Sequence, residues 1–289
     1  MNMNDTQRQT RRDRLLTGLY LVLMLLPLVA GLVLNLFLRE GSDEITVTGA
    51  QIYFTVPMPI QDLPITASQV NSALVVVFIF FLCLFLTQGM RTREISVRQH
   101  IAEFVVEKVS AFVESNMGRR FSSFAPFVAA ILGLSALSSL ISLLGLYAPT
   151  SDINIVGGWA ILVFIMITYY KIKGGFLDYL KGFTQPVALL TPFNVISEFS
   201  TPISMAFRHY GNVLSGSVIS TMLYAALAGL SSIVLGRLPG LLGEIPFLQI
   251  GIPAVLSVYF DVFSGCLQAF IFAMLTMLYI SSNAPEESA

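Results

Sequence analysis

The sequence of 289 residues has few charged side chains: only 11% are Asp, Glu, Lys or Arg, against about a quarter in a typical soluble domain. A water-soluble domain of this length would need more charge to cover its surface. A nucleic-acid-binding protein would need a basic face, whereas the formal net charge here is −1. A disordered chain is excluded as well, because 55% of the residues are hydrophobic and the mean hydropathy is +0.77. These absences leave an integral membrane protein.

Residues for covalent or metal chemistry are also scarce. The two cysteines, Cys83 and Cys266, lie inside apolar runs and are interpreted as small apolar helix residues, and two cysteines cannot form a disulfide framework. Neither histidine, His100 or His209, has a Cys or a second His nearby at metal-ligand spacing. The sequence contains no phosphate-binding loop and no serine–histidine–acid set. We therefore expect no metal, no cofactor and no catalytic residue.

Long unbroken hydrophobic runs predict an all-α integral membrane protein, because a membrane barrel would show short alternating strands instead. A helix crosses the bilayer with about 20 apolar residues. Six segments have a suitable length, and the fifth and sixth are so long that tilt is expected. These segments are 15–38, 70–87, 124–146, 155–170, 187–235 and 247–282.

The first run, 15–38, follows a basic stub and could also be a signal peptide. A signal peptide has an apolar region of about 7–15 residues followed by a small-residue cleavage site. This run is longer and ends in NLFLR (35–39) without such a site, which favours a retained span. The next residues, 41–69, contain three prolines and the alternating run ITVT (45–48), which predict a loop with one short hairpin.

The charged stretch 91–120 has apolar residues at helical spacing, which predicts one amphipathic helix near a membrane surface. These apolar positions are Ile101, Phe104, Val105, Val109, Phe112 and Val113.

Lysine and arginine are unevenly distributed, which predicts the orientation. If the N-terminus is cytoplasmic, the cytoplasmic pieces hold 13 of the 16 basic residues. The other three are Arg39 and Arg237 in external loops and Arg208 in the fifth segment. By the positive-inside rule, both termini are therefore predicted to be cytoplasmic. The cytoplasmic pieces are 1–14, 88–121, 171–186 and the C-terminal tail.

Arg208 lies far from both ends of its hydrophobic segment. A charge there costs at least a few kcal/mol, and a guanidinium cannot shed its proton. Arg208 is either part of a structural ion pair between helices or a fixed positive charge on an ion path. The spacing favours the second interpretation, because Ser204, Arg208 and Asn212 are four residues apart and form one polar stripe. Gly211 and Ser215 beside the stripe allow another helix to approach closely.

Two acids also lie in apolar surroundings. Glu198 precedes Arg208 by ten residues and is expected near the cytoplasmic side, whereas Asp261 is expected about 15 Å below the outer end of the sixth segment. Either could instead be a carboxylate at a helix end that faces headgroup water. Gln268 is expected to share the face of Asp261, and Ser217 to lie on the opposite side of the helix from Arg208. An acid near each surface, with an arginine between them, predicts two offset aqueous paths separated by a positive barrier.

Short motifs surround Arg208 and continue in the last segment. They are PTSDIN (149–154), PFNVISE (192–198), PIS (202–204), FRHYGN (207–212), QAFIF (268–272) and LTMLYI (275–280). In this order, and with Pro126 in the third span, they resemble subunit a of F-type ATP synthases over about residues 65–285.

The resemblance implies a membrane stator beside a rotating ring of c subunits, assembled with peripheral-stalk b subunits and other ATP synthase subunits in the inner (plasma) membrane of a cell. Arg208 would face the ion-carrying carboxylates of the ring, with Gln268 opposite it on the last helix. Asn212 and Ser204 would line the same interface, and Glu198 corresponds to the acid of the cytoplasmic half-channel.

Three positions depart from the family pattern. Many bacterial members carry an acid where Ser217 stands, a histidine where Asp261 stands and a leucine where His209 stands. The resemblance therefore implies that the outer half-channel relies on Asp261, alone or together with Glu244 at its mouth.

The predicted function is a stator subunit whose two half-channels couple H⁺ or Na⁺ movement through the c-ring to ATP synthesis. The alternative is a secondary transporter that binds an anionic solute at Arg208, although the two halves show no internal repeat of the kind such folds contain. A purely structural assembly subunit would explain the hydrophobicity but not the buried charges. We divide the chain into 1–69, with the stub, first span and external loop, and 70–289, the ion-translocation domain.

Overall fold

The computed structural model describes residues 3–38, 49–59, 61–90, 95–185, 187–235, 255–256 and 258–284. Within these ranges six helical segments are long and apolar enough to cross a membrane, which confirms the predicted all-α architecture. They are Leu15–Phe37, Ala67–Thr87, Arg119–Leu144, Ile153–Lys173, Ala188–Val234 and Val258–Asn283.

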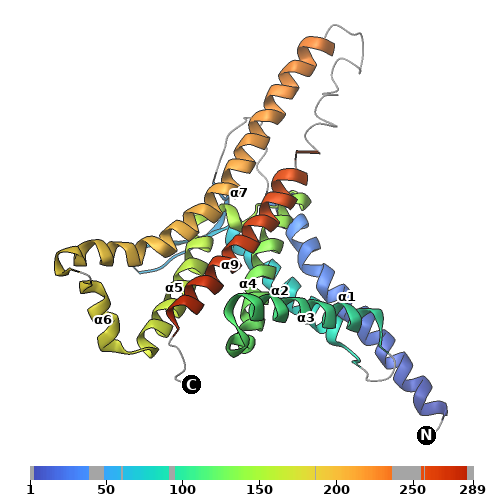
Figure 1. Ribbon diagram of the computed structural model, residues 1–289. Coiled ribbons are helices and arrows are strands. Elements are labelled where there is room, and N and C mark those ends of the chain that lie inside the picture. Colours follow the sequence, from blue (N-terminus) through green and yellow to red (C-terminus); the bar gives the residue numbers. More distant parts are fainter. Residues whose placement is uncertain are drawn as a thin grey trace.

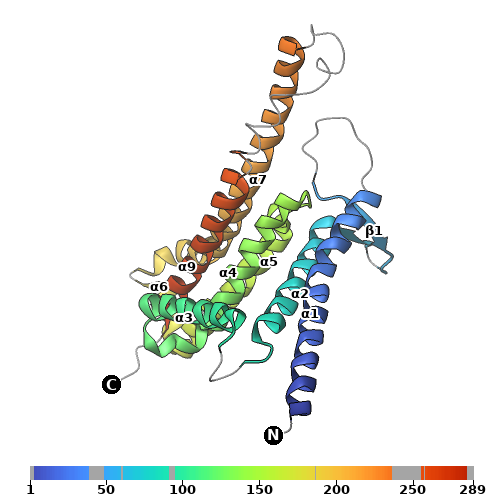
Figure 2. The ribbon, with the colours of Figure 1, turned by 90° about the vertical axis from the view of Figure 1, so that its right-hand side faces the viewer.

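The first two long helices, α1 (Met3–Leu38) and α2 (Ala67–Thr87), pack against each other. Between them lies an antiparallel hairpin of β1 (Ile52–Val56) and β2 (Leu63–Thr66), at the end of the bundle opposite the start of α1 (Figure 2). The predicted hairpin is confirmed, whereas the alternating run 45–48 lies outside the described residues. A capping box at the junction of β2 and α2 satisfies backbone N–H groups and starts the helix directly after the strand.

The predicted amphipathic helix is α3 (Val97–Met117), which runs across one end of the bundle (Figure 1). The hydroxyl of Ser96 accepts a hydrogen bond from the backbone N–H of Gln99 and caps its first turn. Gly118 ends the helix with a positive φ of 85°. This conformation is least costly for glycine, because it has no side chain. One side of α3 packs into the core while the other leaves large apolar side chains exposed.

The middle of the chain forms two spans joined by short turns. A 3₁₀ turn, η1 (Arg119–Phe124), leads into α4 (Ala125–Leu140), and α5 (Ile153–Lys173) runs back toward the same end. The carboxylate of Asp152 caps α5 by accepting from the backbone N–H of Asn154 at 2.9 Å. The shorter elements that follow α4 and α5 are η2 (Ile141–Leu144), η3 (Pro149–Ser151), α6 (Phe176–Thr184) and η4 (Ala188–Leu190).

The last two spans are long and lie antiparallel, side by side, in both ribbon views (Figures 1 and 2). The helix α7 (Thr191–Leu235) has 45 residues, so it is about 68 Å long at 1.5 Å per residue. It curves in Figure 1 and contains Pro202, which removes one backbone hydrogen bond. The final span joins a π-helical turn, η6 (Val258–Ser264), to α9 (Gly265–Asn283). In Figure 1, α7 and α9 slant across α4 and α5, as their predicted lengths require.

One apolar core joins α3, α4, α5, α7 and α9. Its best-buried side chains include Val113, Val128, Val163, Met205, Phe272, Met277 and Ile280. The helices α4 and α9 lie close together at Gly265, where an added Cβ would lie 2.7 Å from that of Ser139.

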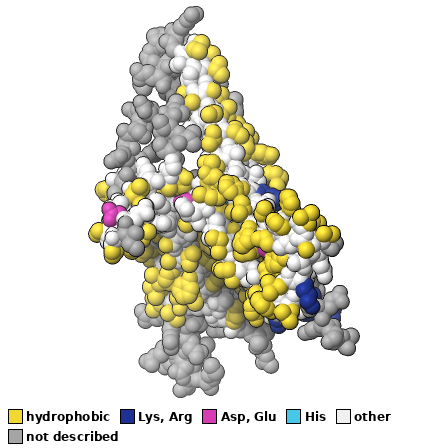
Figure 3. Space-filling model, turned by 90° about the vertical axis from the view of Figure 1, so that its left-hand side faces the viewer, with side chains coloured by type: hydrophobic (Ala, Val, Ile, Leu, Met, Phe, Trp, Pro, Cys, Tyr) yellow, Lys and Arg dark blue, Asp and Glu magenta, His cyan; other side chains and the backbone are white. Residues whose placement is uncertain are grey.

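The outer surface is largely hydrophobic. Figure 3 shows one face on which apolar side chains predominate and only a few charged side chains interrupt them. Such a surface is stable in a lipid environment and would aggregate in water. The beginning of α1 and the end of α9 lie at the same end of the bundle (Figure 1), as an even number of crossings requires.

Candidate functional site

The predicted polar stripe of α7 is an exposed face of the chain. Ser204, Arg208 and Asn212 all lie on it, one helical turn apart, while Met205 and His209 point into the protein. Among the residues that the structure describes, no carboxylate pairs with Arg208. This geometry gives no support to a structural ion pair within the chain. With respect to the described residues, the guanidinium is available to a partner outside the chain.

Gln268 and Asn212 connect α9 to α7. The Nδ2 of Asn212 donates a hydrogen bond of 2.8 Å to the Oε1 of Gln268, whose side chain is 98% buried. Because Asn212 follows Arg208 by one turn, the structure brings Gln268 to the level of the Arg208 stripe. Gln268 thus lies against α7 about one helical turn from Arg208.

Asp261 lies partly buried in the π-helical turn η6, close to the side chain of Ser142, just beyond α4. Gln268 contacts α7, and η6 contacts both α7 and α4, so the shared face of Asp261 and Gln268 stays a prediction. The π turn has more than 3.6 residues per turn, which changes the angle that a seven-residue step covers. The residues that would set the depth of Asp261, 247–254, lie outside the described ranges.

Ser217 is exposed on α7, and its hydroxyl donates to the carbonyl of Leu214 in its own helix at 2.8 Å. The preceding Gly216 faces Phe260, where an added Cβ would lie 3.4 Å from the side chain. Gly216 and Phe260 thus form a contact between α7 and η6, and each is followed in the chain by a predicted site residue, Ser217 or Asp261. Glu244, the other predicted outer acid, lies outside the described residues.

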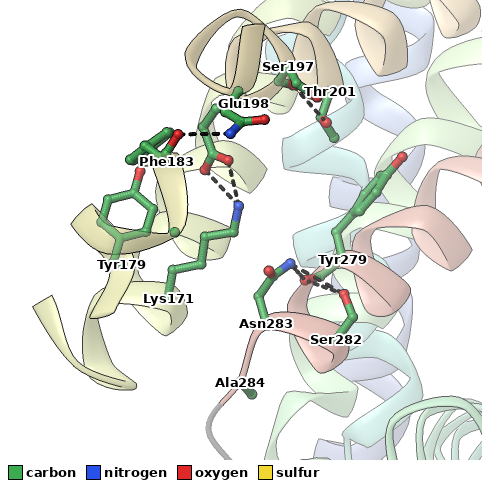
Figure 4. A pocket seen from close by; sticks show the side chains of 12 residues that line it. Lys171, Tyr179, Phe183, Ser197, Glu198, Thr201, Tyr279, Ser282, Asn283 and Ala284 are labelled. Carbon is green, nitrogen blue, oxygen red and sulfur yellow. Dashed lines mark hydrogen bonds and ion pairs between the residues drawn. The ribbon is translucent and has the colours of Figure 1, made fainter. Parts of the chain in front are cut away.

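Glu198 lies in a pocket of about 610 Å³ bounded by α5, α6, α7 and the end of α9 (Figure 4). Lys171, in the last turn of α5, donates to both carboxylate oxygens of Glu198 at 2.8 and 2.7 Å. The sequence indicated Lys171 only as one of the cytoplasmic basic residues, because nothing in its spacing predicts a partner 27 residues away. The ion pair shows that Glu198 has a specific partner and does not merely face headgroup water.

Tyr179, on α6, closes one side of this pocket beside Lys171 (Figure 4). Its pKa is raised by burial and by the neighbouring charge of Glu198, so the phenol stays protonated and can donate a hydrogen bond. Asn194 holds α6 against α7 by donating to the carbonyls of Phe183 and Gln185 at 2.8 and 3.0 Å. Lys171 and Tyr179 therefore place two donor groups beside the carboxylate of Glu198.

A second polar pocket, of about 420 Å³, lies at the opposite end of α5, where Asp152 caps the helix. Tyr147 and Tyr210 line it, and the carboxylate of Asp152 also accepts a hydrogen bond from Ser68. Burial and the charge of Asp152 raise the pKa of Tyr147. Asp152 is not among the predicted site residues, because a helix cap explains an Asp before an apolar run equally well.

Comparison with known proteins decides the family. The family model described as ATP synthase A chain matches residues 70–281, well over half of the chain.

The chain belongs to this family of ATP synthase A chains.

Curated relatives agree with this assignment. The ATP synthase subunit a of Priestia megaterium is 34% identical over 243 residues, which cover 79% of this chain and 97% of the relative. That of Bacillus pumilus is 33% identical over 223 residues, covering 68% and 85%. A subunit a from Propionigenium modestum that is described as sodium ion specific is 26% identical over 270 residues, covering 82% and 86%. The protein is therefore a multi-pass subunit of a multisubunit ATP synthase in the cell membrane.

For an ATP synthase A chain, the arrangement along α7 is informative. The Glu198 pocket includes α7 residues up to Thr201, and the second pocket begins at Tyr210. Arg208 lies between them on the exposed side. The fold therefore separates two polar regions at opposite ends of α5 and places a permanent positive charge between them.

Proposed function

We propose that this chain is the membrane stator subunit whose two half-channels, together with a ring of c subunits, couple ion movement to rotation and ATP synthesis. The observation that carries the proposal is the position of Arg208, exposed on α7 between two polar pockets and without a described carboxylate partner. No covalent chemistry takes place on the chain, which acts through its charges.

In the proposed mechanism, an ion enters from outside near Asp261 and neutralises a carboxylate of the ring. The neutral site can rotate into lipid, which a charged carboxylate could not do at low cost. After nearly a full turn the site reaches the path at Glu198, and Arg208 favours release of the ion by attracting the ionised carboxylate. Arg208 also blocks leakage between the paths. The membrane potential supplies about 2.3 kcal/mol per charge per 100 mV.

The proposed partners follow from the exposed faces. The Ser204–Arg208–Asn212 stripe faces the c-ring, while b subunits and other ATP synthase subunits contact the remainder of the chain. The common end of α1 and α9 supports placing both termini in the cytoplasm, which also puts the Glu198 pocket on that side. Residues 1–69 form an accessory segment and residues 70–289 the ion-translocation domain.

Purification of the complex through a tag on this chain tests the proposal. We expect a ring of small hairpin proteins to co-purify, and the complex in vesicles to make ATP under an imposed ion gradient. Separate H⁺ and Na⁺ gradients identify the ion. A chain that purifies without a ring and carries an anionic solute would contradict the proposal and support a secondary transporter.

The Lys171–Glu198 ion pair gives a prediction for the cytoplasmic half-channel. The Lys171→Gln variant leaves Glu198 without its partner, and we expect ATP synthesis per complex to fall by about two- to tenfold, since a partly exposed pair contributes about 1 kcal/mol. The matched control is Lys173→Gln, which removes the same charge from the same last turn of α5 but lines no described pocket. Equal rates in the two variants would show that the ion pair has no part in transport.

A further inference from the structure

His209 lies at the meeting point of four helices. Its side chain is fully buried, and its Nε2 lies 3.3 Å from the hydroxyl of Ser135 on α4. The ring of Trp159 on α5 stands at 87° to the imidazole with 6.0 Å between centroids, and that of Phe272 on α9 at 86° with 5.6 Å. A residue of α7 is thereby fixed against three other helices at once.

The bond to Ser135 is the directional contact of this ring. Among the described residues the Nδ1 of His209 has no hydrogen-bond partner, so the interaction at Nε2 is the hydrogen bond that orients the ring, beside its edge-to-face contacts with Trp159 and Phe272. Ser135 is also fully buried, so neither partner can turn to solvent for a replacement. The neighbouring inward residues of α7, Met205 and Ala206, are apolar and pack without directional preference.

The position of His209 bears on Arg208 through helix geometry. Consecutive residues of a helix point about 100° apart, and with His209 directed inward Arg208 lies on the exposed side. One turn later, Asn212 is bonded to Gln268 of α9. The two hydrogen bonds hold successive turns of α7 against α4 and α9, and Arg208 directly precedes the first of them.

We propose that the His209–Ser135 hydrogen bond sets the rotation of α7 and hence the direction of Arg208, which makes His209 a positioning residue for ion coupling. This inference rests on the proposed role of Arg208. A rotation of α7 about its axis would keep Arg208 at the same depth in the membrane but would turn its guanidinium away from the ring carboxylate.

The test uses the intact complex in vesicles and four variants: His209→Leu, His209→Gln, Ser135→Ala and the double variant His209→Leu/Ser135→Ala. Three quantities are measured: the amount of assembled complex, the rate of ion-driven ATP synthesis per complex and the passive ion leak per complex. The control is Thr276→Val, which removes another buried hydroxyl, one that donates only to its own helix.

We expect each of His209→Leu and Ser135→Ala to reduce assembly, because each leaves a buried polar group unpaired. We also expect ATP synthesis per complex to fall by about tenfold, because a small displacement of the Arg208 guanidinium lowers the rate even though the charge itself is unchanged. His209→Gln, which can still bond Ser135, should retain most of the rate. The double variant should recover assembly, because both partners are now apolar, but not synthesis per complex.

The double variant separates positioning from a merely structural role. Recovery of synthesis per complex together with assembly would overturn the inference, as would a wild-type rate per complex in His209→Leu. The proposed function fails separately, through undiminished ATP synthesis in an Arg208→Ala complex. A normal rate in His209→Leu with no rate in Arg208→Ala would therefore overturn the positioning role alone.

Discussion

Replacing Arg208 with alanine is expected to abolish ion-driven ATP synthesis while the complex still assembles. The side chain lies on the exposed stripe of α7 and forms no ion pair with a described carboxylate, so its loss should leave the fold intact. The permanent charge is what separates the two ion paths and attracts the ring carboxylate. Removing a preorganised electrostatic group of this kind costs on the order of a hundredfold or more in rate.

The measurement is ATP synthesis per assembled complex in vesicles under an imposed ion gradient, together with passive leak. Arg208→Lys should fail as well, because a compact ammonium lacks the planar fork and the fixed protonation of guanidinium. Arg119→Ala serves as the control, since it removes an exposed arginine in η1, which precedes α4, rather than on α7. Wild-type synthesis in Arg208→Ala would show that the charge is not on the ion path.

Asp261→Asn is expected to slow ATP synthesis, ATP-driven pumping and passive leak together. Asparagine keeps the size of the side chain and can still form hydrogen bonds, but it cannot exchange a proton or bind a cation by charge. We expect a loss of roughly tenfold, which corresponds to about 1.4 kcal/mol in the barrier. In that background, Ser217→Glu should restore part of the flow if both positions face one aqueous cavity.

The Asp152→Asn variant is the comparison for this prediction. Asparagine caps a helix as well as aspartate does, so the variant should fold, and it removes the charge from the second polar pocket. If Asp152→Asn reduces the rate and Asp261→Asn does not, the outer path runs through the Asp152 pocket and Asp261 is a structural polar group. Both variants are assayed in vesicles for synthesis and leak.

The spans and the Arg208 stripe could be predicted because they depend on local rules. The length of an apolar run determines whether it crosses a bilayer, and the helical repeat places Ser204, Arg208 and Asn212 on one face wherever the helix lies. The same rule is weaker for Asp261 and Gln268, because it assumes a uniform helix and the π turn at 258–264 changes the angular step between them.

The amino-acid sequence by itself determined the membrane class, the six helices and the single charge in the middle of the fifth. These follow from the cost of exposing backbone and charge to lipid. Only the tertiary structure decided which polar groups meet: Lys171 with Glu198, Asn212 with Gln268, and Ser135 with His209. The two residues of each pair lie 27, 56 and 74 positions apart in the chain, on helices whose arrangement and rotation are set by side-chain packing. Spacing along one helix carries no information about that packing.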